Sequence, residues 1–382
     1  MKSGIGYVVV VIILPLFFIF VLYKMYPFQS SEVYPDIVFR ATSYYPIQSI
    51  AFYDRDNIVA VGHSRFPEIR FFDSTTGKKT YNLHIGGVPQ LLFFTEFGDI
   101  YSIKYTRQVN GYSVEKWNFK NGLRINSKDI SLRHADLAMF RVSSQGNGMY
   151  LTTKKKHYDL KNSFLIIGRE KNNFTNPFIN MDERVMHDTE ALLLSIFDID
   201  IDSGSEYLIG TSPNGIYEFG LNNLYEYKTI YSGKNIIFLS LARNDKLVAA
   251  SSNGNVYTFI KVNNSWEKRD TNTISDGVYS IQVSPDGEHI AYTQRDNDNK
   301  KLFIVKLGCN LPPTELKIKG KEPVCFAFGT QGKKIAAGMN DGTVAVWNVF
   351  HHSDIPDTKI PDRTQTSRKN DLITKQYSRE EN

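Results

Sequence analysis

The chain has 382 residues, with 45 Lys and Arg against 40 Asp and Glu, and a formal charge of +5. A hydrophobic content of 41% and a charged content of 22% exclude disorder over most of the length. Two cysteines are too few for a disulfide framework or a cysteine-rich zinc site. The length fits two or three domains or one large repeat fold, and the 13% aromatic content favours strands.

The N-terminal segment predicts a membrane span. Nineteen uncharged residues from Ile5 to Tyr23 would cover about 28 Å as a helix, close to the thickness of the hydrocarbon core. Tyr7 and Tyr23 lie near its ends, where aromatic rings favour the headgroup region, and Pro15 is tolerated in lipid. We interpret residues 5–23 as an uncleaved signal anchor after a short tail of residues 1–4. A cleaved signal peptide is the main alternative, although no small-residue cleavage site follows.

The orientation of the span follows less directly from charge. Lys2 precedes the span and Lys24 and Arg40 follow it, so the basic residues are nearly balanced. A very short tail before a single span more often stays in the cytosol. We therefore expect a single-pass membrane protein with its main domain on the non-cytoplasmic side.

A short apolar strand recurs seven times after the span. Its copies centre on Ile50, Leu91, Phe140, Phe197, Leu239, Ile281 and Phe326, at steps of 41, 49, 57, 42, 42 and 45 residues. Each copy is followed by a turn and a second strand. A third strand follows a tight turn such as Asn253-Gly254 or Asp341-Gly342, whose residues supply the positive φ angles of two-residue hairpins.

Four antiparallel strands in each unit, with no helical periodicity, predict an all-β chain with a seven-bladed β-propeller over residues 36–353. Six or eight blades stay open because the second and third units are the least regular. The last unit has three clear strands, whereas residues 36–41 belong to no unit, so we predict that they complete the last blade and close the ring. Residues 24–35 are expected to be a linker and residues 354–382 a disordered polar tail.

Several third strands resemble the corresponding element of a WD repeat. In the first unit Phe72-Asp73 precedes a Thr-Gly-Lys hairpin, the second unit has Trp117-Asn118, and the last has Asp341, Trp347 and Asn348. The matching positions of the seven units are Phe72, Trp117, Ile167, Phe219, Phe259, Val305 and Trp347. Trp-Asn replaces the family's Trp-Asp, and Lys321 stands where the last unit would have its His. The resemblance implies a divergent WD group or a related propeller superfamily.

Candidate chemical motifs are few. Asp198-Ile-Asp-Ile-Asp202 is similar to a calcium loop, but Ser203 and Ile209 replace its glycine and its last glutamate. The same alternation fits an inner strand that runs into a hairpin turn. The eight histidines show no metal-ligand spacing, and no nucleophile elbow, Walker loop or dinucleotide fingerprint occurs. We therefore predict no enzyme activity, catalytic residue, cofactor or metal.

The step of 57 residues contains about ten extra residues around 181–190, and a charged insertion on a rigid scaffold is a candidate partner loop. Its candidate contact residues are Asp182, Glu183, Arg184, His187 and Asp188. Nucleic acid is not expected as a partner, because no basic stripe with interleaved aromatic residues is present.

These observations support a membrane-tethered, WD-repeat-like propeller that acts as a platform for other proteins. The argument from fold to binding is an analogy, since propellers also include enzymes. One alternative is an exported enzyme that uses the axial channel, with Asp198 and Asp200 as the titratable residues of the inner strands. Another is a sensor that binds a ligand in the same channel.

Overall fold

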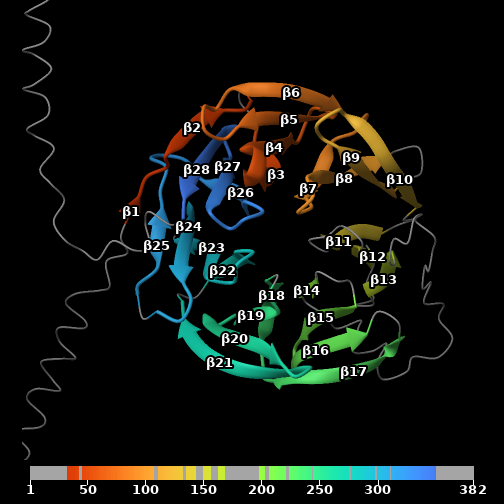
Figure 1. Cartoon of the computed structure of the whole chain (residues 1–382), viewed down its shortest axis with the longest axis vertical. Helices are drawn as coiled ribbons and strands as arrows, with labels where there is room; N and C mark the ends of the chain where they lie inside the picture. The colour runs from red at the N-terminus through yellow and green to blue at the C-terminus, as the bar shows by residue number, and fades with distance from the viewer. Residues whose placement is uncertain are drawn as a thin grey trace, which may run out of the picture.

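The structure is a computed structural model. It describes residues 32–42, 45–106, 111–131, 135–142, 149–155, 162–167, 198–202, 206–220, 223–242, 244–274, 277–296, 299–309 and 311–349. Within these ranges the chain is all-β apart from one turn of 3-10 helix, η1 (Asp54–Asp56). The strands form seven sheets, and Figure 1 shows them arranged around a common centre.

Each sheet corresponds to one blade of a propeller, and its strands follow one another in the chain, except that the two N-terminal strands join the sheets of blades six and seven. Blade one contains β3 (Ile47–Tyr53), β4 (Ile58–His63), β5 (Glu68–Asp73) and β6 (Lys79–His84). Blade two contains β7 (Pro89–Phe94), β8 (Asp99–Thr106), β9 (Gly111–Asn118) and β10 (Leu123–Ser131). Blade three contains β11 (Ala135–Val142), β12 (Met149–Lys155) and β13 (Asn162–Ile167) among the described residues.

The second half of the ring repeats the pattern. Blade four contains β14 (Asp198–Ile201), β15 (Tyr207–Ser212), β16 (Gly215–Gly220) and β17 (Asn223–Ser232). Blade five contains β18 (Ile236–Leu241), β19 (Lys246–Ser251), β20 (Asn255–Val262) and β21 (Ser265–Thr273). Blade six contains β22 (Val278–Val283), β23 (His289–Asp296), β24 (Asn299–Lys306) and β25 (Thr314–Leu316), with β1 (Glu32–Val33) at its edge. Blade seven contains β26 (Pro323–Phe328), β27 (Lys334–Met339) and β28 (Thr343–Asn348), completed by β2 (Ile37–Arg40).

The apolar core lies between neighbouring blades. The first strand of each blade is innermost, and β3 contacts both β7 and β26, while β18 contacts both β14 and β22. Buried aliphatic and aromatic side chains from adjacent sheets pack in the spaces between the blades. A blade cannot bury both of its faces alone, and this is why the sheets form a ring.

The predicted closing strand is confirmed. β2 pairs antiparallel with β28, with Ile37 opposite Val346 and Arg40 opposite Thr343. On its inward face Phe39 packs against Phe72 of blade one, with ring centroids 4.9 Å apart. The N-terminal strand therefore joins the last blade to the first.

A second N-terminal strand extends blade six. Glu32 and Val33 form β1, which pairs in parallel with Glu315 and Leu316 of β25. The Glu32 carboxylate also accepts a hydrogen bond from Lys317 Nζ at 2.6 Å. These two residues belong to the predicted linker of residues 24–35, and a two-residue strand has no periodicity by which the sequence could show it.

The upper rim is defined here as the edge that carries the turns between second and third strands and the connections between blades. The lower rim carries the turns between first and second strands. On the upper rim Gly342 has a φ of +85°, and a Cβ there would lie 2.2 Å from Thr42 Oγ1. The Asp-Gly pair is therefore required by both the tight turn and the close approach of the closing segment.

Candidate functional site

The repeat signature of the last blade forms a polar network on the upper rim. The Thr343 N–H and hydroxyl both donate to the Asp341 carboxylate, at 3.0 and 2.9 Å. Lys321 Nζ donates to Thr343 Oγ1 at 2.7 Å and lies 3.1 Å from Asp341 Oδ2. The hydrogen bonds with Thr343 and Lys321 lower the pKa of Asp341 against the opposing effect of burial. Lysine thus stands in the place of the family's histidine with an ion pair to the same aspartate.

The two tryptophans of the signature differ in their hydrogen bonding. Trp117 lies opposite Ile100, and its indole Nε1 donates to Ser102, two residues further along β8, at 3.3 Å. Trp347 lies opposite Ile335, so the position that corresponds to Ser102 is Ala337. Trp347 is fully buried, and its Nε1 has no acceptor among the described residues. The last blade therefore has the indole without an equivalent of the serine acceptor in blade two.

Ala337→Ser should therefore raise the free energy of unfolding by about 1 kcal/mol, because it supplies the missing acceptor for a buried donor. The matched control is Ala336→Ser on the adjacent, equally buried position, which faces the core between blades seven and one. That hydroxyl would have no tryptophan partner and should destabilise the protein. Urea unfolding of the two variants and the parent measures both effects, and equal destabilisation by both serines would contradict the prediction.

The residues after the aromatic position shape turns. Asp73 Oδ1 accepts a hydrogen bond from the Thr75 hydroxyl at 2.6 Å and from the N–H groups of Thr75 and Thr76, both at 2.8 Å. The bond from the Thr75 hydroxyl, followed by the N–H bonds, lowers the pKa of Asp73. Asn118 Oδ1 accepts from the N–H groups of Lys120 at 3.0 Å and Asn121 at 3.4 Å. The Asn118 amide oxygen therefore accepts the same kind of turn N–H groups as the Asp73 carboxylate, which explains how Trp-Asn can replace Trp-Asp.

Asn348 has a different environment. Its backbone N–H donates to the Asp36 carboxylate at 2.6 Å, so the closing segment supplies the acceptor.

The seven aligned positions of the repeat all lie in third strands. Phe72, Trp117, Phe219, Phe259, Val305 and Trp347 are buried there, and Ile167 lies in the equivalent strand β13.

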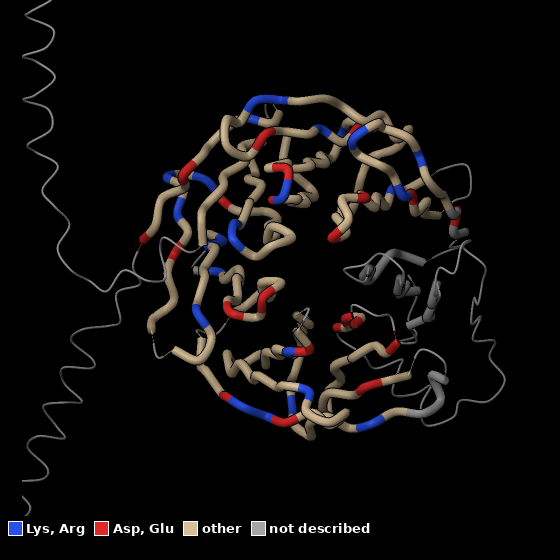
Figure 2. The backbone as a smooth tube through the Cα atoms, in the orientation of Figure 1, with Lys and Arg blue, Asp and Glu red and all other residues tan. Residues whose placement is uncertain are grey.

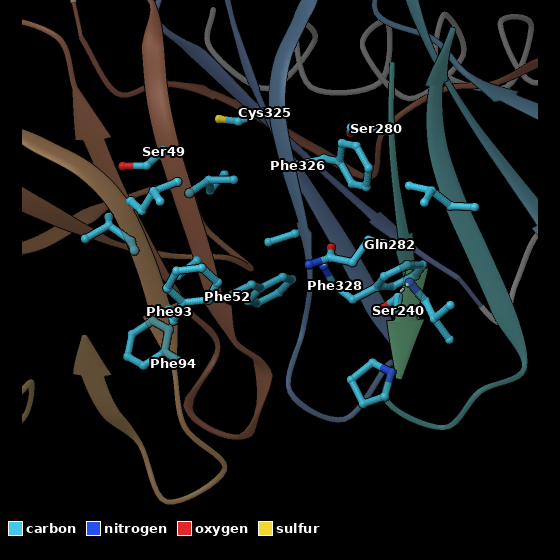
Figure 3. A pocket seen from close by; sticks show the side chains of 18 of the residues that line it. Ser49, Phe52, Phe93, Phe94, Ser240, Ser280, Gln282, Cys325, Phe326 and Phe328 are labelled. Atoms are coloured by element: carbon cyan, nitrogen blue, oxygen red, sulfur yellow. Dashed lines mark hydrogen bonds between the residues drawn. The ribbon is translucent and has the colours of Figure 1, made fainter. Parts of the chain in front are cut away.

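A cavity of about 480 Å³ lies at the centre of the ring. Its wall consists of inner-strand segments of blades one, two, four, five, six and seven, among the residues that the structure describes. Aromatic rings are prominent on this wall, and Figure 3 shows Phe52, Phe93, Phe94, Phe326 and Phe328 with Ser240 and Gln282 nearby. The wall of the cavity therefore combines aromatic rings with polar side chains.

The polar side chains of the inner strands bind the next blade. Asp198 Oδ2 accepts a hydrogen bond from the N–H of Leu239 at 2.9 Å, and Asp200 Oδ2 accepts one from the N–H of Leu241 at 2.8 Å. At the position of Asp200 in the next two blades, Ser240 Oγ accepts from Val283 N–H at 3.3 Å, and Gln282 Oε1 accepts from Phe328 N–H at 3.1 Å. These inter-blade bonds satisfy backbone donors on the free edges of the inner strands.

The suggested calcium loop has a structural explanation here. The second oxygens of Asp198 and Asp200 accept the N–H groups of the residues that follow them, both at 2.9 Å. Asp202 Oδ1 accepts the N–H groups of Glu206 and Tyr207 across the β14–β15 turn. The three carboxylates thus hold the strand, the turn and the next blade.

Asp198→Ala should lower the free energy of unfolding by about 3 kcal/mol, because it removes a charged acceptor and leaves buried backbone donors unpaired. Asp198→Asn keeps one acceptor oxygen and should have a smaller effect. Asp270→Ala, on the exposed outer strand β21, serves as the control and should change stability little. Thermal unfolding compares the three, and a loss at Asp270 as large as that at Asp198 would exclude a specific role for the inter-blade bonds.

An aromatic and arginine cluster lies on the upper rim of blade one. It consists of Tyr45, His63, Arg65, Phe66 and Arg70 and is called the rim cluster below. Phe66 packs edge-on against His63 and Tyr45, with centroids 4.4 and 5.7 Å apart. The Arg65 guanidinium lies 4.9 Å from the Tyr45 ring centre, and that of Arg70 lies 5.1 Å from the centre of Phe66.

Arg70 fixes the rim cluster in place. Its Nη1 donates to the carbonyl of Ala41 at 2.9 Å, and its Nε pairs with Glu68 at 2.7 Å. The sequence analysis missed this site. A signal was present, since the turn Ser64-Arg-Phe-Pro67 carries large side chains where other blades have Asn-Gly or Asp-Gly.

His63 should make stability depend on pH. Its ring is fully buried without hydrogen-bond partners in the described structure, and burial, with a smaller contribution from Arg70, lowers its pKa to about 4. The unfolded chain, with a pKa near 6.5, therefore binds the proton first as the pH falls. The free energy of unfolding should decrease between about pH 6.5 and pH 4, by about 3 kcal/mol at the lower limit.

Urea unfolding from pH 7 to pH 4 measures this loss. His63→Leu removes the titrating group at similar size and should flatten the pH dependence in that window. His84→Leu changes an exposed histidine and should leave the dependence in place. A His63→Leu profile parallel to that of the parent would show that another group controls the acid loss.

Several predicted residues lie outside the described part of the chain. These are the span residues Ile5, Tyr7, Pro15 and Tyr23 and the partner-loop residues Asp182, Glu183, Arg184, His187 and Asp188. In the described ranges, no helix has both the length and the apolar character that crossing a bilayer requires. The prediction of a span at 5–23 therefore remains a prediction.

Comparison with known proteins supports the architecture. A family model described as WD domain, G-beta repeat matches residues 314–348, the stretch from β25 to the end of β28. The fold is similar to the crystal structure of the β-propeller domain of Cps50 (Swd1) from Myceliophteria thermophila. That similarity has a TM-score of 0.60 at 15% sequence identity and covers 82% of this chain and 99% of that chain. No curated protein matches the chain.

The chain is thus a β-propeller by fold. Its matched repeat contains Lys321, Asp341 and Trp347, and the comparisons together support a WD-repeat propeller.

Proposed function

We propose that this chain is a membrane-tethered, seven-bladed WD-repeat-like propeller that acts as a docking platform for another protein. WD-repeat propellers generally serve as protein-interaction scaffolds. The ring supplies a rigid frame, and its upper rim presents turns and connections that include the rim cluster. The partner would be recognised by side chains on that rim.

The rim cluster is the observation that carries this proposal. Tyrosine and arginine dominate the energetics of protein interfaces, since they combine a large contact area with directional polar groups. Here Tyr45, Arg65 and Phe66 hold one another through ring and cation–π contacts. Side chains ordered before binding lose little conformational entropy on contact with a partner.

The inter-blade bonds make a channel enzyme a weaker alternative. Asp198 and Asp200 are the acidic residues that the sequence analysis offered for catalysis. Each accepts the N–H of the following residue and an N–H of blade five. This bonding supports a structural role for both carboxylates.

The membrane tether is the second part of the proposal. It rests on the uncharged stretch from Ile5 to Tyr23, with the propeller on the non-cytoplasmic side. Ser367→Cys in the C-terminal tail tests the orientation on intact cells with a membrane-impermeant thiol reagent, using the parent chain as the control for Cys309 and Cys325. Labelling above the parent supports export, whereas labelling only after permeabilisation would reverse the orientation.

Photo-crosslinking in the native membrane tests the platform. A benzoyl-phenylalanine at position 66 places the probe in the rim cluster, and one at Phe97 places it on a lower-rim turn with even greater exposure. We expect a discrete protein adduct from position 66 and none of comparable yield from position 97. Equal yields at both positions, or none at either, would contradict a partner on the upper rim.

A further inference from the structure

We propose that the outer edge of blades six and seven rests against the membrane surface and contacts anionic lipid headgroups. This inference depends on the proposed tether and adds which side of the propeller faces the bilayer. The first described residues, Glu32 and Val33, determine where the propeller is attached. β1 fixes Glu32 and Val33 to the outside of blade six, and Figure 1 shows this strand at the periphery of the ring.

The length of the connecting chain limits the distance from the bilayer. Only eight residues, 24–31, lie between the predicted end of the span at Tyr23 and Glu32. Even fully extended, eight residues reach about 28 Å. A propeller attached through β1 must therefore keep its blade-six edge within that reach of the lipid, while the opposite blades lie further away.

Side chains beside β1 have the chemistry of a membrane-contact surface. Tyr34 follows β1 directly and is 60% exposed, and Val38 points outward from the neighbouring strand β2 at 49%. Leu311, in the connection between β24 and β25 of the same blade, is 54% exposed. Tyrosine and leucine next to a tether favour the interface between headgroups and acyl chains.

An exposed lysine on this edge supplies a positive charge that an anionic headgroup could contact. The stretch Lys317-Ile-Lys-Gly-Lys321 leaves β25, and Lys319 is exposed. Lys317 pairs with Glu32 at 2.6 Å, Lys301 lies 3.8 Å from Glu315 and Lys321 lies 3.1 Å from Asp341, which leaves Lys319 as the exposed lysine of this stretch outside these pairs. Figure 2 shows both basic and acidic segments along this edge of the ring. Lysine near the surface of an anionic leaflet is attracted to it, which favours this orientation.

Lipid photo-crosslinking of the full-length protein reconstituted in vesicles tests the inference. Benzoyl-phenylalanine is placed singly at Tyr34 and Leu311, and at two control positions on other blades, Tyr227 of β17 and Leu123 of β10. The pairs are matched in residue type, and the controls are 41% and 64% exposed. We expect lipid adducts to be about fivefold more abundant at 34 and 311 when phosphatidylglycerol is included in phosphatidylcholine vesicles, as one lysine at an anionic surface would produce.

The outcomes separate this inference from the tether itself. Equal adduct yields at all four positions, or higher yields at 227 and 123, would overturn the proposed edge. Enrichment at 34 and 311 that is the same without phosphatidylglycerol would overturn the headgroup assignment. Extraction of the parent chain from the vesicles by alkaline carbonate is measured in parallel. Release by carbonate would refute the tether, whereas retention with uniform crosslinking would refute only the orientation.

Discussion

Replacing Trp347 with alanine should lower the free energy of unfolding by about 4 kcal/mol, since it empties a fully buried site of indole size. The side chain packs in the core between blades six and seven, against Leu302, Leu316 and Phe328 among others. The cavity would lie between the sheets of blades six and seven, and the strands on both sides limit its collapse. Equilibrium urea unfolding in detergent measures the loss.

A conservative pair of variants separates packing from hydrogen bonding. Trp347→Phe reduces volume but also removes an indole N–H that has no acceptor in the described structure. Trp117→Phe reduces volume equally and breaks the bond to Ser102. We therefore expect Trp347→Phe to cost less than Trp117→Phe, by about 1 kcal/mol. A larger loss at 347 than at 117 would show that its indole nitrogen is satisfied in solution.

Phe39→Asp should open the ring. The change places a carboxylate beside Phe72 in the core shared by blades seven and one, and should lower the free energy of unfolding by about 3 kcal/mol. Loss of β2 would also uncover the edge of β28, whose Val344 and Val346 are buried in the closed ring. Limited proteolysis should then cut the N-terminal segment before the rest of the propeller unfolds.

The same strand contains its own control. Val38 alternates with Phe39 and points to solvent, so Val38→Asp introduces the same charge with the same change in strand propensity. We expect it to alter stability by less than about 0.5 kcal/mol and to leave the protease pattern unchanged. If the two substitutions behave alike, the closing role of β2 comes from its backbone pairing and not from the packing of Phe39.

Much of the architecture follows from patterns within single strands. The alternation of apolar residues, the Asn-Gly and Asp-Gly turns and the step of about forty residues predicted repeated antiparallel strands. The aligned aromatic position also follows from the repeat, because one register places it at the same depth in every blade. The surplus strand at residues 36–41 predicted the closure, since the last unit lacked an outer strand that only a distant segment could supply.

The inter-blade bonds were less visible. Asp198 and Asp200 fitted an inner strand better than a calcium loop, but the sequence did not show what their carboxylates bind, because their partners Leu239 and Leu241 lie about forty residues further along the chain. Every residue except proline has a backbone N–H, so the residue types do not show which N–H groups these carboxylates bind. The missing acceptor of Trp347 is similar, since Ala337 is unremarkable until the register of Trp117 and Ser102 gives it a counterpart.

The sequence by itself determined the class of fold, the register of the third strands and the closing strand, because these depend on local periodicity and turn chemistry. Only the tertiary structure decided which side chains meet. Tyr45 joins Arg65 and Phe66 at the rim cluster because the closing segment and the β4–β5 turn arrive at the same place, and β1 lies on blade six because the chain passes it on the way to blade seven. Contacts between distant segments depend on how the blades close into a ring, and no local pattern encodes that geometry.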